Sequence, residues 1–345
     1  MNSKIVEDRE VADFFIGACS ETLLSFLQEL HSALKKYSEN PEIIPPRIVG
    51  TIPSGSTVHL YMPVIDDVYS GVKTLGYNAS SNMGFVGSIN VTDAESGMLY
   101  GTLQAKELTG VRTALVSCIG LYHQLDKFEN LGAINCTVFG SGLQAFWHVL
   151  FCARLLSGKC KQLNVCFVNR SSKIDLEPIR TILNRDDTNM ELSFTLVKLS
   201  EKLAVKKVVA NSHIIFGCAP SEAANIHYTD LAEVETIVPH TYISLIGSYK
   251  PHMHECDAKL ISEFQKQKVP ILVDSKEHTL LEAGELIDSN VKPHQLQEIG
   301  RLEKDKLQTI RCEKNNRTIT LCKIVGLSIM DICVAKKLLE VSKLD

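Results

Sequence analysis

Apolar and polar positions follow different rhythms along the chain, and each rhythm predicts a different kind of structure. In the first 40 residues, leucines between Leu23 and Leu34 recur about every 3.6 residues, which predicts helix as far as Pro41. Over 47–104, short runs rich in Val, Ile and Tyr alternate with turn-forming sequences, which predicts antiparallel hairpins. Another helix is predicted over Thr109–Leu121.

Between 134 and 274 short apolar runs alternate with helical or loop segments. This alternation predicts an α/β fold with a Rossmann-type, doubly wound sheet. Strands are predicted at Ile134–Phe139, Leu163–Val168, Leu192–Val197, His213–Phe216, Tyr242–Ile246 and Ile271–Val273.

The end of the chain repeats the strand-then-helix pattern once more. A strand is predicted over Thr318–Ile324, and Ser328 with Asp331 fits an acidic capping box that opens a last helix. We expect this part to return to the N-terminal domain. The predicted division is therefore 1–115 with 320–345 as a discontinuous α+β domain for substrate binding and dimerisation, and 116–319 as the Rossmann NAD(P)-binding domain.

Composition narrows the class of protein. The chain has 345 residues, 45% of them hydrophobic and 22% charged, with a net charge of −4, which is typical of a globular protein and gives no footprint for nucleic acid. No apolar run is long enough to span a membrane, and the polar N-terminus is unlike a targeting signal, so we expect a cytoplasmic protein. Its 11 cysteines lack CxxC spacing, which favours reduced thiols over a disulfide framework.

One segment has the order of residues that a dinucleotide site requires. The predicted strand Ile134–Phe139 runs directly into Gly140-Ser141-Gly142-Leu143-Gln144-Ala145, a G-x-G-x-x-A motif, and a helical pattern follows. The first glycine permits a tight turn, the second lets the backbone approach a pyrophosphate, and the alanine keeps the helix near the strand. The helix N-terminus then presents free N–H groups to the anion.

The end of the next predicted strand indicates which dinucleotide binds. An NAD site usually has a carboxylate there for the ribose 2′-hydroxyl. This chain has Asn169-Arg170-Ser171 instead. Because a guanidinium binds phosphate oxygens bidentately, Arg170 favours NADP(H) over NAD(H). A solvated surface arginine is the alternative interpretation.

Two further patterns have competing interpretations. Cys218 and Ala219 follow the fourth predicted strand of the Rossmann segment and are expected to line the dinucleotide; a nucleophilic Cys218 would need a neighbouring base, and none is visible. His252, His254 and Cys256 are potential zinc ligands, but no second cluster accompanies them, so we expect no metal.

The whole set of motifs resembles the ornithine cyclodeaminase/mu-crystallin family. The matching segments occur in the family's order and are Pro46-Arg47, Tyr61-Met62-Pro63, Lys73, Leu108-Thr109-Gly110-Val111-Arg112-Thr113-Ala114, Gly140–Ala145, Asn169–Ser171, Ile246–Pro251, Glu255-Cys256-Asp257, Val273-Asp274, Glu282–Leu286, Val325-Gly326-Leu327 and Asp331. The resemblance implies a homodimer that performs nicotinamide chemistry at a carbon bearing an amine or imine next to a carboxylate.

The resemblance also implies roles for individual residues. Arg47, Arg112 and Lys73 would hold the substrate carboxylate, for which cationic side chains are suited. Lys73 would also serve in proton transfer, and Asp257 matches the position of the family's acid/base. Thr113 and Gly326 fall in segments expected near the dinucleotide.

One departure from the family pattern bears on the substrate. Ornithine-cyclising members carry a Glu two residues before the Met-Pro pair, where this chain has Leu60. Leucine cannot bind a distal ammonium, so the sequence favours an NADPH-dependent ketimine reductase acting on small imino acids. An ornithine cyclodeaminase that recycles its NAD is the alternative within enzymes, and a non-catalytic NADPH-binding protein is the alternative outside them.

Overall fold

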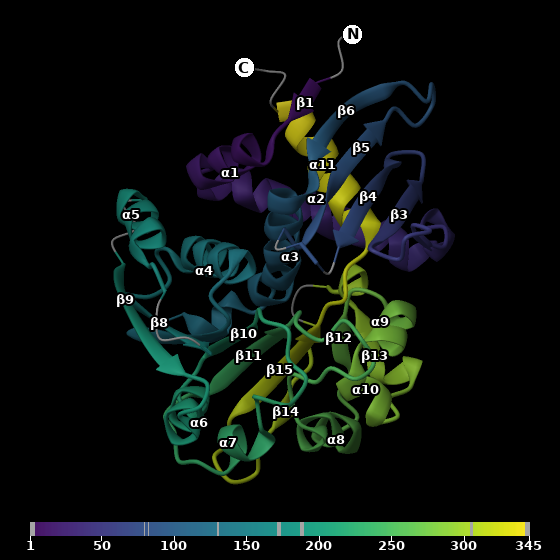
Figure 1. The fold of residues 1–345 in the computed structure, drawn as a ribbon. Coiled ribbons are helices and arrows are strands. Elements are labelled where there is room, and N and C mark those ends of the chain that lie inside the picture. Colours follow the sequence, from purple (N-terminus) through teal and green to yellow (C-terminus); the bar gives the residue numbers. More distant parts are fainter. Residues whose placement is uncertain are drawn as a thin grey trace. The chain divides into compact units, whose positions relative to one another are not determined.

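The computed structural model describes residues 4–78, 80–81, 83–129, 131–170, 174–186, 190–303 and 306–341. The chain forms two compact units (Figure 1). Unit 1 consists of Met1–Val116 and Gly326–Asp345, and unit 2 consists of Ser117–Val325. Helix α3 (Ala105–Tyr122) and the segment after β15 (Thr318–Lys323) connect the two units along the chain.

Unit 1 is built on a sheet in the order β1-β6-β5-β4-β3-β2. Strand β1 is parallel to β6, and the other neighbours are antiparallel, as the hairpin pattern predicts. The strands are β1 (Lys4–Val6), β2 (Ile48–Thr51), β3 (Thr57–Ile65), β4 (Ser70–Asn78), β5 (Phe85–Thr92) and β6 (Leu99–Gln104).

One face of this sheet is covered by the C-terminal helix. Helix α11 (Ser328–Val341) lies against β3–β6 and against α2 (Ser20–Glu39), and α1 (Asp8–Gly17) precedes α2 (Figure 1). Glycines make room for the helix, since a Cβ at Gly101 would lie 2.7 Å from Leu339. The predicted N-terminal helix is thus two helices, and it ends at Glu39 because the following Asn40-Pro41 cannot continue it.

Unit 2 is built on a second sheet, in the order β13-β12-β15-β11-β10-β7-β8-β9. All of these neighbours are parallel, and β14 pairs antiparallel with β15. The strands are β7 (Ala133–Phe139), β8 (Gln162–Asn169), β9 (Glu191–Lys198), β10 (Ile214–Gly217), β11 (His240–Leu245), β12 (Ile271–Val273), β13 (Leu296–Glu298), β14 (Ile310–Arg311) and β15. The predicted α/β, doubly wound sheet is confirmed, and the order reverses between β7 and β10.

The predicted domain boundary at residue 320 is wrong. Strand β15 does not join the sheet of unit 1, because it pairs in parallel with β11 and β12 in unit 2. The chain therefore returns to unit 1 only at Gly326. An apolar strand that is buried on both faces gives no sign in its own sequence of which sheet it joins.

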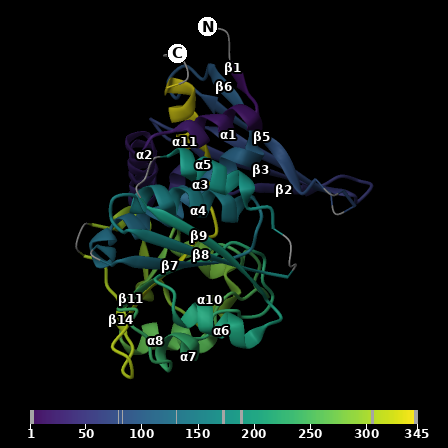
Figure 2. The same cartoon turned by 90° about the vertical axis from the view of Figure 1, so that its left-hand side faces the viewer.

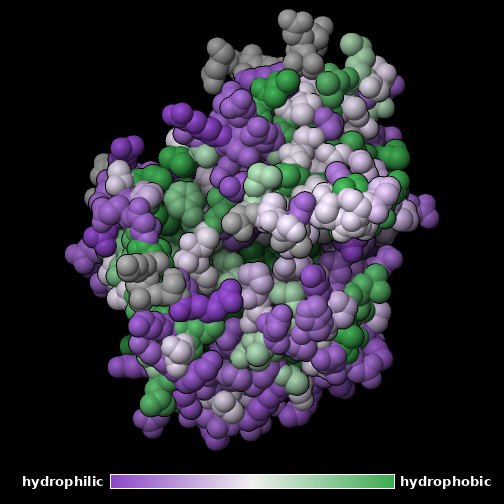
Figure 3. Space-filling model, in the orientation of Figure 1, coloured by the Kyte–Doolittle hydropathy of each residue, from purple (hydrophilic) through white to green (hydrophobic). Residues whose placement is uncertain are grey.

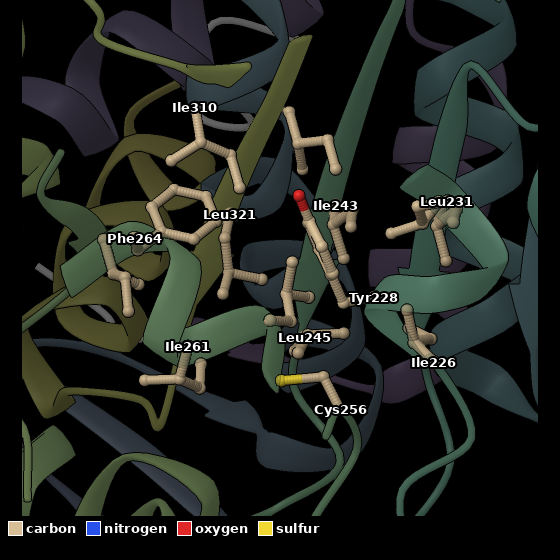
Figure 4. Packing of buried hydrophobic residues seen from close by; sticks show 14 of the residues in the cluster. Ile226, Tyr228, Leu231, Ile243, Leu245, Cys256, Ile261, Phe264, Ile310 and Leu321 are labelled. Atoms are coloured by element: carbon tan, nitrogen blue, oxygen red, sulfur yellow. The ribbon is translucent and has the colours of Figure 1, made fainter. Parts of the chain in front are cut away.

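Helices cover both faces of the second sheet (Figure 2). They are α4 (Leu143–Leu156), α5 (Glu177–Arg185), α6 (Lys202–Ala210), α7 (Tyr228–Ala232), α8 (Ala258–Lys266), α9 (Lys276–Glu282) and α10 (Gly284–Asp288). On one face, Ile243, Leu245 and Leu321 of the sheet pack against Phe264 and Leu231 of α8 and α7 (Figure 4). Each such buried side chain contributes about 1.5–3 kcal/mol relative to exposure.

Hydrophilic side chains cover most of the surface over α7 and α8 (Figure 3). Among the described residues, no helix is both long and apolar enough to cross a membrane. The eleven cysteines all lie in described segments and form no disulfide, as their spacing predicts.

Candidate functional site

A cavity lies within unit 2, at the carboxyl ends of its parallel strands. Its volume is about 950 Å³, and its walls include the residues after β7, β8 and β10 and the loop that follows β11. Parallel α/β sheets bind ligands at this edge, where the strand order reverses. The cavity is large enough for a dinucleotide.

The G-x-G-x-x-A motif forms one wall of this cavity. Gly140 has a φ of +116°, and an added Cβ would lie 3.1 Å from Cys218 and Ala219, so both its conformation and its surroundings require glycine. Gly142 is the N-cap of α4 and makes no side-chain cap. The N–H groups of Leu143, Gln144 and Ala145 in the first turn therefore lack intrahelical acceptors and suit an anion.

The tip of β8 lies beside this loop. The amide of Asn169 donates to the Ser141 hydroxyl over 2.8 Å, which ties the strand tip to the motif. Arg170 lines the cavity, and so does Lys202, the first residue of α6. Lys202 is a further cation of the lining that the sequence analysis missed, because only the packing of β9 and α6 brings it to the same cavity as Arg170. Ser171 lies outside the described residues.

The segment after β10 forms the floor of the cavity. Cys218 and Ala219 line it as expected. Burial raises the pKa of the Cys218 thiol well above its ordinary value, so the thiol stays protonated and is a poor nucleophile. Among the described residues, no group of three or more His, Cys, Asp and Glu side chains is arranged to hold a metal ion.

Unit 1 contains a buried cluster of opposite charges. Lys73 on β4 and Arg112 on α3 both bind Oδ1 of Asp331 on α11, over 2.7 Å and 3.2 Å. The Lys73 ammonium also donates to the Thr109 hydroxyl over 2.7 Å. The side chains of Lys73 and Asp331 are 3% and 1% exposed, so a sheet, a helix and a segment more than 200 residues away in sequence form one site.

The cluster has one more cation than anion. Because two cations share a single carboxylate, the cluster carries a net positive charge that one further carboxylate would balance. Burial lowers the pKa of Lys73 to about 8, although Asp331 opposes that shift. A lysine with this pKa is able to release its proton near neutral pH.

The capping box predicted from Ser328 and Asp331 is wrong. The Ser328 hydroxyl donates to the Pro63 carbonyl over 3.0 Å, and Asp331 binds the two cations instead of the helix N-terminus. Asp331 thus belongs to one of the family-like segments, but its contacts differ from those that the sequence predicts. Its place near the start of an apolar helix was the available signal, because a fully buried carboxylate requires a partner.

Arg47 is exposed and directly precedes β2. The register pairs Ile48 with Tyr61 and Met62 with Lys73, so continuing it by one residue places Arg47 opposite Met62 on the same face as Lys73. Two strand spacings separate Arg47 from Lys73, or about 10 Å. The three predicted cations therefore share one side of the sheet, where Lys73 and Arg112 bind Asp331.

Thr113 and Gly326 lie beside the charge cluster in unit 1. Thr113 donates its hydroxyl to the Thr109 carbonyl within α3. Gly326 has a φ of +98°, and an added Cβ would lie 3.2 Å from the Arg112 guanidinium. Glycine is therefore needed there to accommodate Arg112. The expected contact of both residues with a dinucleotide stays a prediction.

Asp257 occupies a helix cap. It is the N-cap of α8, where its carboxylate accepts from the backbone N–H of Leu260 over 3.0 Å and from that of Tyr228 over 3.1 Å. His227 lies 3.5 Å from its other oxygen. Asp257 does not belong to the described lining of the cavity. The acid/base role of Asp257 stays a prediction. The hydrogen bonds of its carboxylate are those of a helix cap.

Comparison with known proteins agrees with this architecture. A model described as the ornithine cyclodeaminase/mu-crystallin family matches residues 18–343. The chain is 41% identical to the uncharacterized protein YGL159W of Saccharomyces cerevisiae, over 99% of this chain and 97% of that protein. It is 25% identical to a Δ(1)-pyrroline-2-carboxylate reductase of Bacillus thuringiensis, over 89% of each chain.

A solved structure has the same fold. The Thermococcus litoralis Δ(1)-pyrroline-2-carboxylate reductase, in complex with NADH and L-proline, matches 99% of this chain and 97% of its own, with a TM-score of 0.70 and 17% identity.

Proposed function

Since the chain belongs to the ornithine cyclodeaminase/mu-crystallin family, we propose that it is an NADPH-dependent reductase of small cyclic 2-imino acids. The reaction converts a cyclic ketimine carboxylate into the corresponding cyclic amino acid. The observation that carries the proposal is the buried cluster of Lys73, Arg112 and Asp331, whose net positive charge suits one carboxylate. The Bacillus relative is named for a reaction of this class.

The residues around the cavity fit a dinucleotide phosphate. The uncapped N-terminus of α4 suits the pyrophosphate, and Arg170 with Lys202 suits a 2′-phosphate. The carboxylates among the described lining residues, Glu222 and Glu255, come from the segments after β10 and β11, not from the tip of β8. The tip of β8 therefore offers the adenosine ribose a cation in place of the usual acid.

The protein's own residues bind the substrate and manage its proton. Arg112 and Lys73 hold the carboxylate, and Asp331 keeps both cations oriented. When bound, NADPH supplies the hydride to the imine carbon. The imine nitrogen takes up one proton in the same reaction, and Lys73 is suited to deliver it because burial lowers its pKa to about 8.

The surroundings of Lys73 favour a cyclic imine over ornithine. The residues that share its face of the sheet are Val58, Leu60, Met62 and Val64 on β3, and Gly71, Leu75 and Tyr77 on β4. None of these described residues is acidic, so this face of β3 and β4 offers no partner for a distal ammonium. An apolar ring is accommodated better.

Turnover of a defined panel tests the proposed function. Purified protein is incubated with NADPH and Δ1-pyrroline-2-carboxylate, its six-membered homologue, pyruvate with ammonia, or ornithine, and NADPH oxidation is followed at 340 nm. We expect oxidation with the cyclic imines. Binding of NADPH without any turnover would establish the non-catalytic alternative. In a parallel reaction with NAD⁺ in place of NADPH, release of ammonia from ornithine without net formation of NADH would establish a cyclodeaminase.

The cofactor preference has its own test. Arg170→Asp removes the guanidinium and offers the ribose a carboxylate, so we expect the preference for NADPH over NADH to reverse. Arg180→Asp is the matched control, because Arg180 is also exposed in unit 2 but does not line the cavity. A ratio of NADPH to NADH affinity that stays the same in Arg170→Asp would remove the argument for a 2′-phosphate.

A homodimer is also part of the proposal. Its support within the chain is the face of the unit 1 sheet opposite α11, where Ile48 and Ile65 are 66% and 67% exposed. Exposed apolar side chains that share one face are typical of an interface. We expect light scattering to give the mass of two chains, and the double variant Ile48→Asp with Ile65→Asp to give one.

A further inference from the structure

A second buried charge cluster lies in unit 2, beside the cavity. Lys323 on β15 is 1% exposed and binds Oε2 of Glu255 over 2.9 Å. Glu285 of α10 lies 3.8 Å from the same ammonium. The Ser248 hydroxyl donates to Glu285 over 2.7 Å. The cluster contains two carboxyl groups and one ammonium, and Glu255 is its member that lines the cavity.

The two oxygens of Glu255 have different surroundings. Oε2 accepts from Lys323 and from the backbone N–H groups of Gly247 and Ser248, over 2.9, 2.8 and 2.9 Å. Oε1 is buried, and among the described residues no donor lies within hydrogen-bond distance of it. A buried oxygen without a donor is costly unless a ligand or water supplies one.

The backbone is shaped to admit this oxygen. Gly217 ends β10 and Gly247 follows β11, so the two glycines lie at the carboxyl ends of neighbouring strands. An added Cβ at Gly217 would overlap Oε1, and one at Gly247 would lie 2.8 Å from it. Both positions must be glycine for the Glu255 side chain to lie between the strand ends and the cavity.

The direction of the pKa shift of Glu255 agrees with a carboxylate that lacks a hydrogen-bond donor at Oε1. Burial raises the pKa of the Glu255 carboxyl, with Lys323 opposing that shift and Glu285 adding to it. A donor placed at Oε1 would favour the ionised form, because hydrogen bonds to a carboxylate stabilise its charge. A ligand that donates a hydrogen bond to Oε1 would therefore complete the hydrogen bonding of the carboxylate, whose Oε2 already accepts from Lys323.

The position of Glu255 indicates which part of a dinucleotide it faces. This step rests on the proposed function. The phosphate motif follows β7, and the adenosine half lies toward β8, where Arg170 is found. The other half must then extend toward β10 and β11, on the opposite side of β7. Glu255 lies at the ends of those two strands.

We propose that Glu255 binds the nicotinamide half of the dinucleotide, with Oε1 accepting a hydrogen bond from a ribose hydroxyl or from the carboxamide N–H. Lys323 and the amides of Gly247 and Ser248 hold Oε2 and orient the carboxylate. Glu255 thereby contacts the nicotinamide half of the cofactor, which Arg170, on the adenosine side, does not reach.

Glu255→Gln tests this contact because the donors at Oε2 determine how the amide lies. They require the amide oxygen, so the NH₂ group takes the place of Oε1 and offers the ligand a donor where it needs an acceptor. Lys323 keeps Glu285 as a counter-charge, so no unpaired buried charge remains. Affinities are measured by calorimetry for NADPH and for 2′,5′-ADP, which lacks the nicotinamide half. NADH and AMP form the equivalent pair without the 2′-phosphate.

We expect Glu255→Gln to weaken NADPH binding about tenfold or more, as for a lost hydrogen bond to a charged group, and to leave 2′,5′-ADP within about twofold. Glu298→Gln is the matched control, since Glu298 is a buried carboxyl at the end of β13 and does not line the cavity. Glu255→Asp, which keeps the charge but withdraws the oxygen, should act in the same direction and serves if the Gln variant does not fold.

The outcomes separate this proposal from the proposed function. Unchanged or tighter NADPH binding overturns it, and so does an equal loss for NADPH and 2′,5′-ADP, which indicates a merely structural carboxyl. In both cases the dinucleotide proposal stands. Absence of binding of either dinucleotide to the wild-type chain overturns both proposals.

Discussion

Asp331→Asn tests whether the buried cluster of unit 1 is a carboxylate site held together by its own anion. The substitution keeps the size of the side chain and an oxygen near Lys73, but it removes the charge that Lys73 and Arg112 share. Two buried cations then face each other without an anion. We expect the folded state to lose stability and the site to gain affinity for an added carboxylate.

The magnitude follows from the burial of the three groups. Removing one partner of a buried ion pair costs about 3–5 kcal/mol. Because Asn retains one acceptor for Lys73, we expect about 3 kcal/mol, which corresponds to a fall in Tm of roughly 6–12 °C for a unit of this size. Asp186→Asn is the matched control: its pair with Arg154 is more exposed, with 21% of the Asp186 side chain accessible, so its loss should be smaller.

The assay measures Tm with and without picolinate, a planar analogue of a cyclic 2-imino acid. A bound ligand stabilises the folded state according to its concentration and affinity. Loss of Asp331 lowers the pKa of Lys73 further, so the assay is run at acidic pH, where Lys73 stays protonated and the variant has an additional uncompensated positive charge. Picolinate should then raise the Tm of the variant more than that of the wild type, and chloride at the same ionic strength should not. A variant that is as stable as the wild type, or a Tm shift by picolinate that is the same in both, would refute the reasoning.

Substitutions at three further positions address single features of the two units. Because the pKa of Lys73 is about 8, picolinate affinity measured by calorimetry should be constant at lower pH and fall as the pH rises through 8. Lys73→Arg should remove this pH dependence. A wild-type affinity that does not change with pH would contradict the prediction. Asp257→Asn should keep both the Tm and the turnover of the wild type, because Asn caps a helix as well as Asp does. Asp257→Ala should lower the free energy of unfolding, measured with denaturant, by about 1 kcal/mol. A folded but inactive Asp257→Asn would restore the acid/base role. Gly140→Ala should weaken NADPH binding by roughly 5- to 150-fold, because a φ of +116° costs alanine about 1–3 kcal/mol. Normal affinity would count against the phosphate loop.

Much of the fold could be predicted because its signals are local. The parallel strands of unit 2 are short apolar runs bounded by turn residues, and β7, β8 and β9 each lie within one residue of their predicted bounds. The phosphate loop was equally visible, since a tight turn, a close backbone approach and a helix start must follow one another along the chain. The very short strands β13 and β14 were missed, because two or three residues carry no periodicity.

The charge clusters could not be predicted in the same way, because their members meet only in the folded chain. Lys73 and Asp331 are 258 positions apart, and Glu255 and Lys323 are 68 apart. The sequence around Asp331 fitted a local interpretation, a capping box, which competed with the correct one. Only the packing of α11 on the sheet shows that the carboxylate points to Lys73 and not to its own helix N-terminus.

Leu60→Glu tests whether the apolar face beside Lys73 selects the substrate. Leu60 pairs with Leu75, and Lys73 pairs with Met62, so residue 60 is a diagonal neighbour of Lys73 at about 7–8 Å. A carboxylate there would lie on the same face, within reach of the distal ammonium of a diamino acid whose own carboxylate is held by Lys73.

We expect Leu60→Glu to gain ornithine binding and to lose affinity for picolinate, because the new anion repels the ligand carboxylate and replaces an apolar contact. Leu60→Gln has the same size without the charge and should lose picolinate affinity only slightly. If the Glu and Gln variants bind ornithine equally well, the charge at this position does not discriminate between substrates, and the preference for a cyclic imine must come from elsewhere.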